Sequence, residues 1–575
     1  MTQRPWLAHY PSDVEAELAP PPFDHLPALI SAAIHTYGPT KAFTQCMPNG
    51  MNGSLTYNKV DELSDDFAAY LRGVIGVAQG DRVAVQMPNC LSYPVVVFGV
   101  LKAGCVLVNT NPLYTRSEMV HQFSDSGAKV LVIIDMFADR LPDVLPKTNI
   151  ETVVTLRIAE FFPPLIAGVI RLVQKWWSRS LPKIRVDHDA FRRALAQGRA
   201  VKSPEKAKSY LQGVGSETLA ALQYTGGTTG VSKGAMLSHG NLVVNTLQMI
   251  SMCGTFIRPG KEVVVTALPL YHIFAFTVNL LGFFHVGARN ILVPTPRPPS
   301  NLKRVFENYK VTWLTGVNTL FNALLKERWF TESTPKHLVA SAAGGMALHE
   351  SVAKRWRDAT GTPIVEGYGL TESSPVLTFN PLGGMGKDGS IGIPVPSTDI
   401  ECVDDEGKTV PVGEPGELVA RGPQIMQGYW QRPEESAQAL RDGWLSTGDI
   451  AQMDADGYFT IVDRKKDMIL VSGFNVYPNE VEERLASAPG VIEVGVIGVP
   501  DERTGESVSA FIVVEQPPPT KEAILAHARE TLSAYKIPAT LTFVDELPKS
   551  PIGKILRREL RTTAFSPEIT QKGAQ

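Results

Sequence analysis

The stretch Tyr224-Thr-Gly-Gly-Thr-Thr-Gly-Val-Ser-Lys-Gly-Ala235 is the most informative part of this 575-residue sequence. Its four glycines let the backbone turn tightly and bring its N–H groups close to an anion. It differs from the G-x-x-x-x-G-K-[ST] loop because Gly234 follows Lys233. We predict a loop that binds the β- and γ-phosphates of a nucleotide. The predicted phosphate-binding residues are Thr225, Gly226, Gly227, Thr228, Thr229, Gly230, Ser232 and Lys233.

On both sides of this loop, short β-branched runs alternate with helix-length amphipathic stretches over about the first 450 residues. Continuous apolar runs separated by helices are typical of parallel strands that are covered on both faces. The sequence therefore predicts an α/β fold, with stacked and mostly parallel sheets in a large N-terminal domain. The predicted strands are 82–87, 130–134, 262–266, 290–293 and 311–314.

The pattern changes towards the C-terminal end of this large domain. Gly and Pro become dense, and runs such as 416–421 alternate like antiparallel strands, so we predict a small β-rich subdomain over about 391–462. The charged string Asp463-Arg-Lys-Lys-Asp467 then interrupts two apolar runs. We place the domain boundary there, with 1–462 as the large domain and 463–575 as a small α+β domain.

Within the small domain we expect strands near 493–497 and 508–514 and a helix near 521–532. We also expect a helix that starts at Asn479, because Asn favours the N-cap and Glu482 stands three residues further on as a capping-box partner.

Overall composition narrows the class of protein. Hydrophobic residues make up 44% and charged residues 20%, which excludes a disordered or fibrous chain. Lys plus Arg total 55 against 58 Asp plus Glu, so no basic excess exists to hold a nucleic acid, and we expect no such partner. The five cysteines are scattered and never spaced C-x-x-C, which favours the reducing cytoplasm. The first 22 residues lack the pattern of a secretory signal.

One segment suggests contact with a membrane surface. No apolar run is long enough to cross a bilayer, but 158–173 is largely apolar and is followed by Trp176 and Trp177 beside Lys175. Paired tryptophans next to cations are typical of an interfacial anchor. A surface segment that packs on its own domain would give the same pattern, so both interpretations stay open.

Several motifs along the chain resemble those of one superfamily. Besides the loop at 224–235, they are Glu366-Gly-Tyr-Gly-Leu-Thr-Glu-Ser373, Leu445-Ser-Thr-Gly-Asp449 and Pro548-Lys-Ser-Pro-Ile-Gly-Lys-Ile555. They resemble motifs of the adenylate-forming superfamily of acyl-CoA synthetases, luciferases and peptide-synthetase adenylation domains, and its bacterial long-chain fatty acyl-CoA synthetases in particular. The resemblance extends from about Leu55 to about Leu560.

The resemblance implies a two-step ligase reaction. A long-chain fatty acid would attack ATP to form an acyl-adenylate and pyrophosphate, and CoA would then form the thioester and release AMP. Two anions meet in the first step, so the site needs well-placed cations. The implied cofactor is Mg²⁺, with ATP and CoA as co-substrates and the fatty acid as the acid substrate.

The resemblance also assigns roles around the nucleotide. Tyr368 would stack on adenine, Thr371 would contact the α-phosphate, and Glu372 would hold Mg²⁺, with Thr225 as a second metal ligand. Asp449 would accept hydrogen bonds from the ribose hydroxyls, assisted by Arg464. The ammonium of Lys554 would bridge the attacking carboxylate and the α-phosphate. The remaining predicted nucleotide contacts are Gly345, Gly367 and Gly369.

Lys554 lies far from the loop in sequence, so the resemblance implies that a mobile small domain carries it into the site. This domain would then rotate about a hinge at Asp463 and present Lys465, Ser472 and Gly473 to CoA.

The acyl group would lie beside Leu268-Pro-Leu-Tyr-His-Ile-Phe-Ala-Phe276, where His272 resembles an aromatic gate. The predicted acyl contacts are His272, Phe276, Gly345 and Met346. Core packing would produce the same apolar pattern. The sequence does not reveal the length of a tunnel, although the resemblance favours long chains over medium ones.

Other interpretations share part of this pattern. A medium-chain or aryl-acid CoA ligase, or a luciferase-like oxygenase, would carry the same nucleotide motifs. A peptide-synthetase adenylation enzyme would need an acidic residue near His272, where none is found. A membrane-bound fatty-acid binding or uptake module with a vestigial ATP site is disfavoured by the intact Lys554, Glu372 and Asp449. The sequence does not determine the oligomeric state, and a homodimer stays open.

Overall fold

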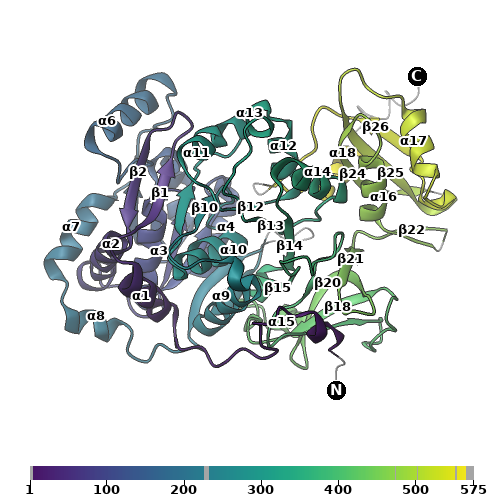
Figure 1. Cartoon of the computed structure of the whole chain (residues 1–575). Helices are drawn as coiled ribbons and strands as arrows, with labels where there is room; N and C mark the ends of the chain where they lie inside the picture. The colour runs from purple at the N-terminus through teal and green to yellow at the C-terminus, as the bar shows by residue number, and fades with distance from the viewer. Residues whose placement is uncertain (1–3, 226–231, 473, 502, 551–552, 565–575) are drawn as a thin grey trace.

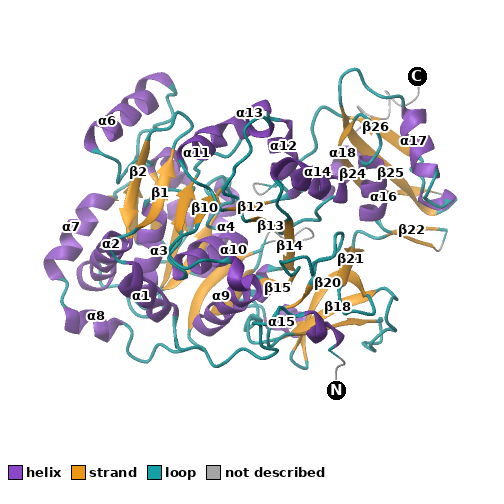
Figure 2. Ribbon diagram, viewed as in Figure 1, coloured by secondary structure: helices purple, strands orange, loops and turns teal. Residues whose placement is uncertain are grey.

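In the computed structural model, the larger part of the chain is built around two sheets of mostly parallel strands (Figures 1 and 2). The structure describes residues 4–225, 232–472, 474–501, 503–550 and 553–564. The first sheet has nine strands in the order β16-β15-β14-β13-β12-β10-β11-β1-β2. They are β1 (Lys41–Cys46), β2 (Asn52–Thr56), β10 (Val263–Thr266), β11 (Arg289–Leu292), β12 (Trp313–Gly316), β13 (Ala340–Ala343), β14 (Ile364–Gly369), β15 (Val376–Phe379) and β16 (Ile393–Pro394).

The second sheet has seven strands in the order β7-β6-β5-β3-β4-β8-β9, and all its pairs are parallel except β8 with β9. They are β3 (Arg82–Gln86), β4 (Val106–Thr110), β5 (Val130–Ile134), β6 (Thr152–Leu156), β7 (Asp189–Ala190), β8 (Leu219–Tyr224) and β9 (Gly234–Ser238). The predicted strands 82–87, 130–134, 262–266 and 290–293 match to within one residue at either end, whereas the strand predicted at 311–314 begins at Trp313. The predicted α/β class is confirmed.

Helices cover these sheets, and α3 (Ser92–Lys102) lies in the main core. Its residues Ser92–Leu101 are all buried, as expected for a helix that is apolar on nearly every side. The same core cluster contains Phe43 from the first sheet and Val83 from the second. The other helices of the large domain are α1 (Leu26–Tyr37), α2 (Tyr57–Ala69), α4 (Arg116–Ser126), α5 (Leu141–Val144), α6 (Pro164–Leu172), α7 (Phe191–Val201), α8 (Pro204–Tyr210), α9 (His239–Cys253), α10 (Ile273–Ala275), α11 (Lys303–Asn308), α12 (Asn318–Lys326), α13 (Arg328–Thr331), α14 (Glu350–Thr360) and α15 (Pro433–Ala439).

A third, antiparallel sheet follows in sequence and corresponds to the predicted β-rich region. It comprises β17 (Asp399–Val403), β18 (Gly416–Arg421), β19 (Leu440–Arg441), β20 (Trp444–Met453) and β21 (Phe459–Arg464). The N-terminal segment packs on it, because Trp6 contacts the ring of Phe459 and Arg4 forms an ion pair with Asp399. Figure 1 shows the first described residues, in dark purple, beside β18.

The fourth sheet is built from residues after the predicted boundary and has the order β23-β22-β25-β24, with β26 beside β25. Its elements are β22 (Ile469–Val471), β23 (Phe474–Val476), α16 (Pro478–Ala486), β24 (Val491–Asp501), β25 (Gly505–Val514), α17 (Lys521–Arg529), β26 (Thr540–Phe543) and α18 (Arg557–Ala564). Asp463 lies inside β21. The division at residues 462 and 463 stays a prediction.

The capping prediction at Asn479 is wrong. Helix α16 begins at Pro478 with Tyr477 at its N-cap and no side-chain cap, so Asn479 lies inside the first turn. The backbone N–H of Asn479 instead donates to Oδ2 of Asp463 at 2.6 Å. Glu482 also has other partners, since its Oε1 accepts a hydrogen bond from the backbone N–H of Val496.

Candidate active site

The ends of the glycine-rich loop meet between β8 and β9 and are anchored on α4. The backbone N–H of Thr225 donates to the carbonyl of Lys233 at 2.9 Å. A ring nitrogen of His121 lies 2.9 Å from the carbonyl of Ser232. The hydroxyl of Tyr224 donates to Asp125 at 2.7 Å. The chain therefore fixes both ends of the loop. The predicted residues Gly226, Gly227, Thr228, Thr229 and Gly230 lie outside the described residues.

Tyr429 connects this loop to the predicted metal ligand. The ammonium of Lys233 lies 5.2 Å from the centre of the Tyr429 ring, a cation–π distance. The hydroxyl of the same tyrosine donates to Oε1 of Glu372 at 2.7 Å. Glu372 itself lies with Thr371 in a short 3₁₀ turn, Thr371–Ser373, directly after β14. The structure thus brings Lys233, Thr371 and Glu372 into one region.

Sequence reasoning missed Tyr429, because its position depends on pairing with a distant segment. The backbone N–H of Trp430 donates to the carbonyl of Gly234, and that of Met236 donates to the carbonyl of Gly428, so this segment lies along β9. The aromatic pair Tyr429-Trp430 was the available signal in the sequence. It does not reveal its partner strand.

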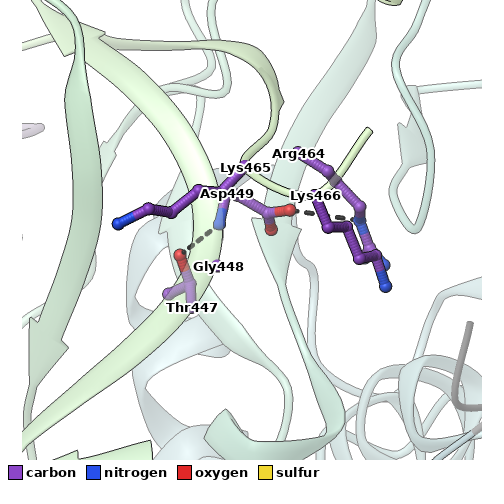
Figure 3. A pocket seen from close by; sticks show the side chains of 6 residues that line it. All are labelled: Thr447, Gly448, Asp449, Arg464, Lys465 and Lys466. Carbon is purple, nitrogen blue, oxygen red and sulfur yellow. Dashed lines mark hydrogen bonds and ion pairs between the residues drawn. The ribbon is translucent and has the colours of Figure 1, made fainter. Parts of the chain in front are cut away.

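The predicted adenine and ribose residues also come together. The hydroxyl of Tyr368, on β14, donates to Oδ2 of Asp449, on β20, at 2.6 Å. Asp449 and Arg464 are directly opposite each other in the antiparallel pair β20–β21, and Nε of Arg464 lies 3.1 Å from Oδ1 of Asp449. Figure 3 shows this pair among the side chains that line a cavity. The cavity has a volume of about 290 Å³. The cavity is lined by Thr447, Gly448, Asp449, Arg464, Lys465 and Lys466.

The predicted residues Gly345, Gly367 and Gly369 differ in how strongly the structure requires glycine. A Cβ at Gly369 would lie 1.8 Å from the carbonyl oxygen of Pro375, so no larger residue fits there. Gly345 has φ +79°, which favours glycine. A Cβ at Gly367 would meet the carbonyl of Thr378 at 3.4 Å, an ordinary contact. Two of the three predicted glycines therefore have a clear structural reason.

Lys554 reaches the same region from the small domain. Its charge interacts with Arg464 and Asp449, and it also acts on His272 on the acyl side. Burial, together with the positive charge of Arg464, lowers the pKa of the Lys554 ammonium to about 8. The neighbouring Gly553 packs tightly on the large domain, because a Cβ there would lie 2.7 Å from Arg297 and from Thr319. The structure therefore brings Lys554 towards the predicted ribose residues Asp449 and Arg464.

His272 is held in one orientation and stays neutral. Its Nδ1 accepts the backbone N–H of Phe274 at 3.3 Å, which caps α10. Burial lowers the pKa of its imidazole to about 4, and the charge of Lys554 contributes. Phe276 is fully buried, and Met346 packs against the same core cluster. Phe276 therefore lies in the apolar interior, whereas His272 and Met346 are partly exposed. Core packing would produce the same contacts as acyl binding.

Of the predicted CoA residues, Lys465 lines the same cavity as Asp449 and Arg464, whereas Ser472 does not line it. Lys465 forms ion pairs with Asp405 at 2.7 Å and Glu417 at 3.1 Å. Ser472 lies in the turn between β22 and β23, where its backbone N–H donates to the carbonyl of Thr504. In Figure 1, β22 lies on the side of the small domain away from β14. Gly473 lies outside the described residues.

Glu372 fits the role of a magnesium ligand. Within the described ranges, no group of three His, Cys, Asp or Glu side chains could hold a metal by itself. Mg²⁺ is commonly held by one or two carboxylates together with substrate phosphates. Burial raises the pKa of the Glu372 carboxyl, and the hydrogen bond from Tyr429 goes to Oε1 alone. A divalent cation on this carboxylate would offset the cost of its burial.

Comparison with known proteins identifies the family. A model described as AMP-binding enzyme matches residues 31–430, and one described as AMP-binding enzyme C-terminal domain matches residues 480–554. The chain belongs to the AMP-binding enzyme family. Among individual proteins, it is 47% identical to a long-chain-fatty-acid–CoA ligase of Escherichia coli O6:H1 (strain CFT073), over 97% of this chain and 98% of that protein.

Two further similarities are informative. The chain is 36% identical to a feruloyl-CoA synthase from Amycolatopsis sp., over 88% of this chain and 94% of that protein. The crystal structure of the anthranilate CoA ligase AuaEII in complex with anthranoyl-AMP matches with a TM-score of 0.82 at 26% identity. That match covers 98% of this chain and 99% of the other.

Proposed function

We propose that this protein is a long-chain-fatty-acid–CoA ligase that activates its acid through an acyl-adenylate. The observation that carries the proposal is the packing of the Lys554 segment on the large domain, where the neighbouring Gly553 approaches Arg297 and Thr319. In this arrangement the charge of Lys554 acts on both Asp449 and His272. A cation between the nucleotide side and the acyl side is what the meeting of two anions requires. The 47% identity to a long-chain ligase, against 36% to a feruloyl-CoA synthase, favours a long alkyl substrate over an aryl acid.

The proposed first half-reaction forms the adenylate. The fatty-acid carboxylate attacks the α-phosphate of ATP, a P–O bond forms, and the bond to pyrophosphate breaks. Lys554 stabilises the growing negative charge, and the neutral His272 beside the carboxylate adds no competing charge. Thr371 would contact the α-phosphate. Glu372 and Thr225 would hold Mg²⁺, which neutralises phosphate charge when bound.

Asp449 would bind the ribose in this step. A carboxylate has about four lone-pair positions, and Tyr368 and Arg464 use one oxygen each. The remaining positions can accept both vicinal hydroxyls of a ribose. Tyr368 would stack on the adenine, and the loop ending at Ser232 and Lys233 would bind the phosphates.

The proposed second half-reaction requires another domain orientation. The thiol of CoA attacks the acyl carbonyl, and AMP leaves as the C–O bond breaks. Ser472, which lies between β22 and β23, would have to move to the site, which supports rotation of the small domain about Asp463. The ion pairs of Lys465 with Asp405 and Glu417 would break in that rotation.

ATP–pyrophosphate exchange tests the function directly. Purified protein with Mg²⁺ and palmitate should exchange labelled pyrophosphate into ATP, and it should form palmitoyl-CoA when CoA is added. Palmitate should be used more efficiently than octanoate or a cinnamate-type acid. Exchange that depends on an aryl acid alone would reject the long-chain assignment. Absence of exchange with every acid would reject ligase activity.

We also propose that the enzyme works in the cytoplasm and contacts the inner face of the membrane through α6 and the turn after it, Val173–Trp177. Across the part of the chain that the structure covers, no helix is both long and apolar enough to span a bilayer. Ile170 faces the protein, whereas Leu165 is 88% exposed and Trp177 is 89% exposed. The other exposed apolar residues of this face are Val169, Leu172, Val173 and Trp176.

Charge supports an anionic lipid surface as the partner of this face. Residues 161–186 contain five Arg or Lys and no Asp or Glu, in a chain whose net charge is −3. The ammonium of Lys175 lies 5.3 Å from the centre of the Trp176 ring, so cation and ring lie together. Amphipathic segments of this kind bind anionic bilayers through apolar contact and electrostatic attraction. Figure 1 shows α6 at the edge of the molecule.

A vesicle-binding assay tests the contact. The double variant Trp176→Ala/Trp177→Ala should bind vesicles of phosphatidylglycerol and phosphatidylcholine about tenfold more weakly than the wild type. The control Leu113→Ala, which removes an exposed apolar side chain elsewhere, should bind like the wild type. Equal binding of the double variant and the wild type would reject this surface.

A further inference from the structure

Arg557 lies at the start of α18, three residues after Lys554, and its guanidinium points into a buried cluster of polar groups. The side chain is only 13% exposed. All three nitrogens of the guanidinium donate hydrogen bonds, and two of these bonds go to Glu482. The partners of the guanidinium are Asp463 at 3.1 Å, Asn479 at 2.5 Å, Glu482 at 2.8 and 3.1 Å, and Asp467 at 3.5 Å.

Asp463 is the member of this cluster that lies at the proposed hinge. Its side chain is fully buried, and its two oxygens have different partners. Oδ1 accepts the backbone N–H of Arg464 at 2.6 Å and also contacts Arg557. Oδ2 accepts the backbone N–H of Asn479, at the start of α16. One carboxylate therefore ties together β21, α16 and α18.

The segment that carries Lys554 is itself well braced. The backbone N–H of Ser550 donates to the carbonyl of Lys554 at 2.7 Å, and the backbone N–H of Lys554 donates back to the hydroxyl of Ser550 at 3.1 Å. The backbone N–H of Leu556 donates to the carbonyl of Pro548 at 2.9 Å. Because Arg557 is the next residue, its position is closely coupled to that of Lys554.

These contacts join the nucleotide side to the lysine by way of the hinge. Asp449 pairs with Arg464, which is adjacent to Asp463 in sequence, and Asp463 pairs with Arg557. Arg557 is covalently linked to Lys554 through two residues. The rigid fork of an arginine suits this role, because it fixes direction as well as distance.

We propose that Arg557 is a positioning residue that fixes the Lys554 segment to the hinge carboxylate of Asp463 during adenylate formation. This inference rests on the proposed function, in which Lys554 serves the first half-reaction. The guanidinium of Arg557 binds side chains of the protein, and its effect on the reaction is exerted through Lys554. Without the Asp463–Arg557 contact, the lysine keeps its charge and loses its fixed position.

Removing the guanidinium should therefore affect the two half-reactions unequally. Misplacement of a catalytic group by about 1 Å can cost about 100-fold in rate. Arg557→Met should lower the maximal rate of ATP–pyrophosphate exchange with palmitate by about tenfold to 100-fold, with a KM for ATP changed less than about threefold. Conversion of supplied palmitoyl-adenylate to palmitoyl-CoA should stay within about threefold of the wild type.

Arg561 offers a matched control on the same helix. It lies one turn further along α18, and its guanidinium binds Asp467 at 3.1 Å. Arg561→Met should leave both half-reactions within about threefold of the wild type. A merely structural role for Arg557 predicts instead that both half-reactions of Arg557→Met fall together, and that result would overturn the inference. Retention of full exchange by Arg557→Met would overturn it as well.

A double-mutant cycle covers the case in which Arg557→Met fails to fold. Arg557→Lys keeps the positive charge but lacks the forked guanidinium. Its midpoint of thermal unfolding should match that of the wild type, whereas pyrophosphate exchange should still fall selectively. Asp463→Asn combined with Arg557→Lys should lose no more exchange than the more impaired single variant, because both remove one contact. If the loss of exchange in the double variant equals the product of the two single losses, Asp463 and Arg557 are not coupled. Wild-type exchange with palmitate, measured in parallel, separates failure of this inference from failure of the proposed function.

Discussion

The hydroxyl of Tyr368 donates a 2.6 Å hydrogen bond to Oδ2 of Asp449, across 81 residues of sequence. The two residues come from different sheets, since β14 belongs to the nine-stranded sheet and β20 to the β-rich one. The bond therefore links the proposed adenine contact to the proposed ribose contact. It also fixes the direction of a carboxylate whose other oxygen is paired with Arg464.

This relationship predicts the effect of removing one oxygen atom. Tyr368→Phe keeps the ring for stacking and removes the hydrogen bond that orients Asp449. A hydrogen bond to a charged group contributes about 1.5 to 3 kcal/mol, so the KM for ATP in pyrophosphate exchange should rise about tenfold or more. The control Tyr458→Phe, which removes a hydrogen bond to Met385 in the β-rich region, should leave this KM unchanged. A KM within twofold for Tyr368→Phe would contradict the proposed role of Asp449.

The lowered pKa of Lys554 predicts a loss of adenylate formation at alkaline pH. The ammonium is charged below its pKa of about 8 and neutral above it, and the proposed mechanism requires the charged form. The kcat/KM for ATP in pyrophosphate exchange should therefore fall as pH rises through about 8. Lys554→Arg keeps its charge over this range, so its slower exchange should lack the alkaline decline. A profile for the wild type that stays flat up to pH 10 would contradict the assignment.

The proposed role of Glu372 as a Mg²⁺ ligand predicts that a variant at this position needs more Mg²⁺. Glu372→Gln keeps the shape of the side chain and its contact with Tyr429, but it removes the negative charge that would hold Mg²⁺. The Mg²⁺ concentration for half-maximal exchange should rise about tenfold or more. Chelation of Mg²⁺ should abolish exchange by the wild type, and added Mg²⁺ should restore it. Tyr429→Phe serves as a comparison, because it removes a neighbour of Glu372 and leaves the carboxylate in place. If Glu372→Gln has the same Mg²⁺ dependence as the wild type, Glu372 is not a Mg²⁺ ligand.

Much of the fold was predictable because a strand that is buried on both faces is a continuous apolar run in the sequence. The run Val130–Ile134 is apolar throughout and forms β5 with the predicted bounds, since its neighbours cover both of its faces. Local signals were less reliable where long-range contacts compete with them. Asn479 was predicted as a helix cap, but Asp463 takes its backbone N–H.

The same distinction applies to the site. The motifs placed Tyr368, Asp449 and Arg464, and the structure brings these three together. Tyr429 and Arg557 were missed because their meaning depends on partners that no short pattern reveals. Tyr429 reaches Glu372 over 57 residues, and Arg557 reaches Asp463 over 94.

The tight approach of Gly553 to the large domain predicts a variant that impairs one half-reaction. Gly553 has φ +94°, and a Cβ there would lie 2.7 Å from both Arg297 and Thr319. Both close atoms are ends of side chains, which can shift, so Gly553→Ala should displace the segment of Lys554 only slightly and lower pyrophosphate exchange by about tenfold. Thioester formation from supplied palmitoyl-adenylate should be spared, because that step uses the other orientation in the proposed mechanism.

Gly505→Ala is the matched control for this prediction. Gly505 lies in the same small domain with φ +81°, and a Cβ there would make only an ordinary contact of 3.7 Å with the carbonyl of Leu470. Both variants carry the strain of a left-handed alanine, so a difference between them isolates the contact with Arg297 and Thr319. Gly505→Ala should keep exchange within about threefold of the wild type. If the two variants lose exchange equally, backbone strain explains the loss, and the close approach at Gly553 has no special role in adenylate formation.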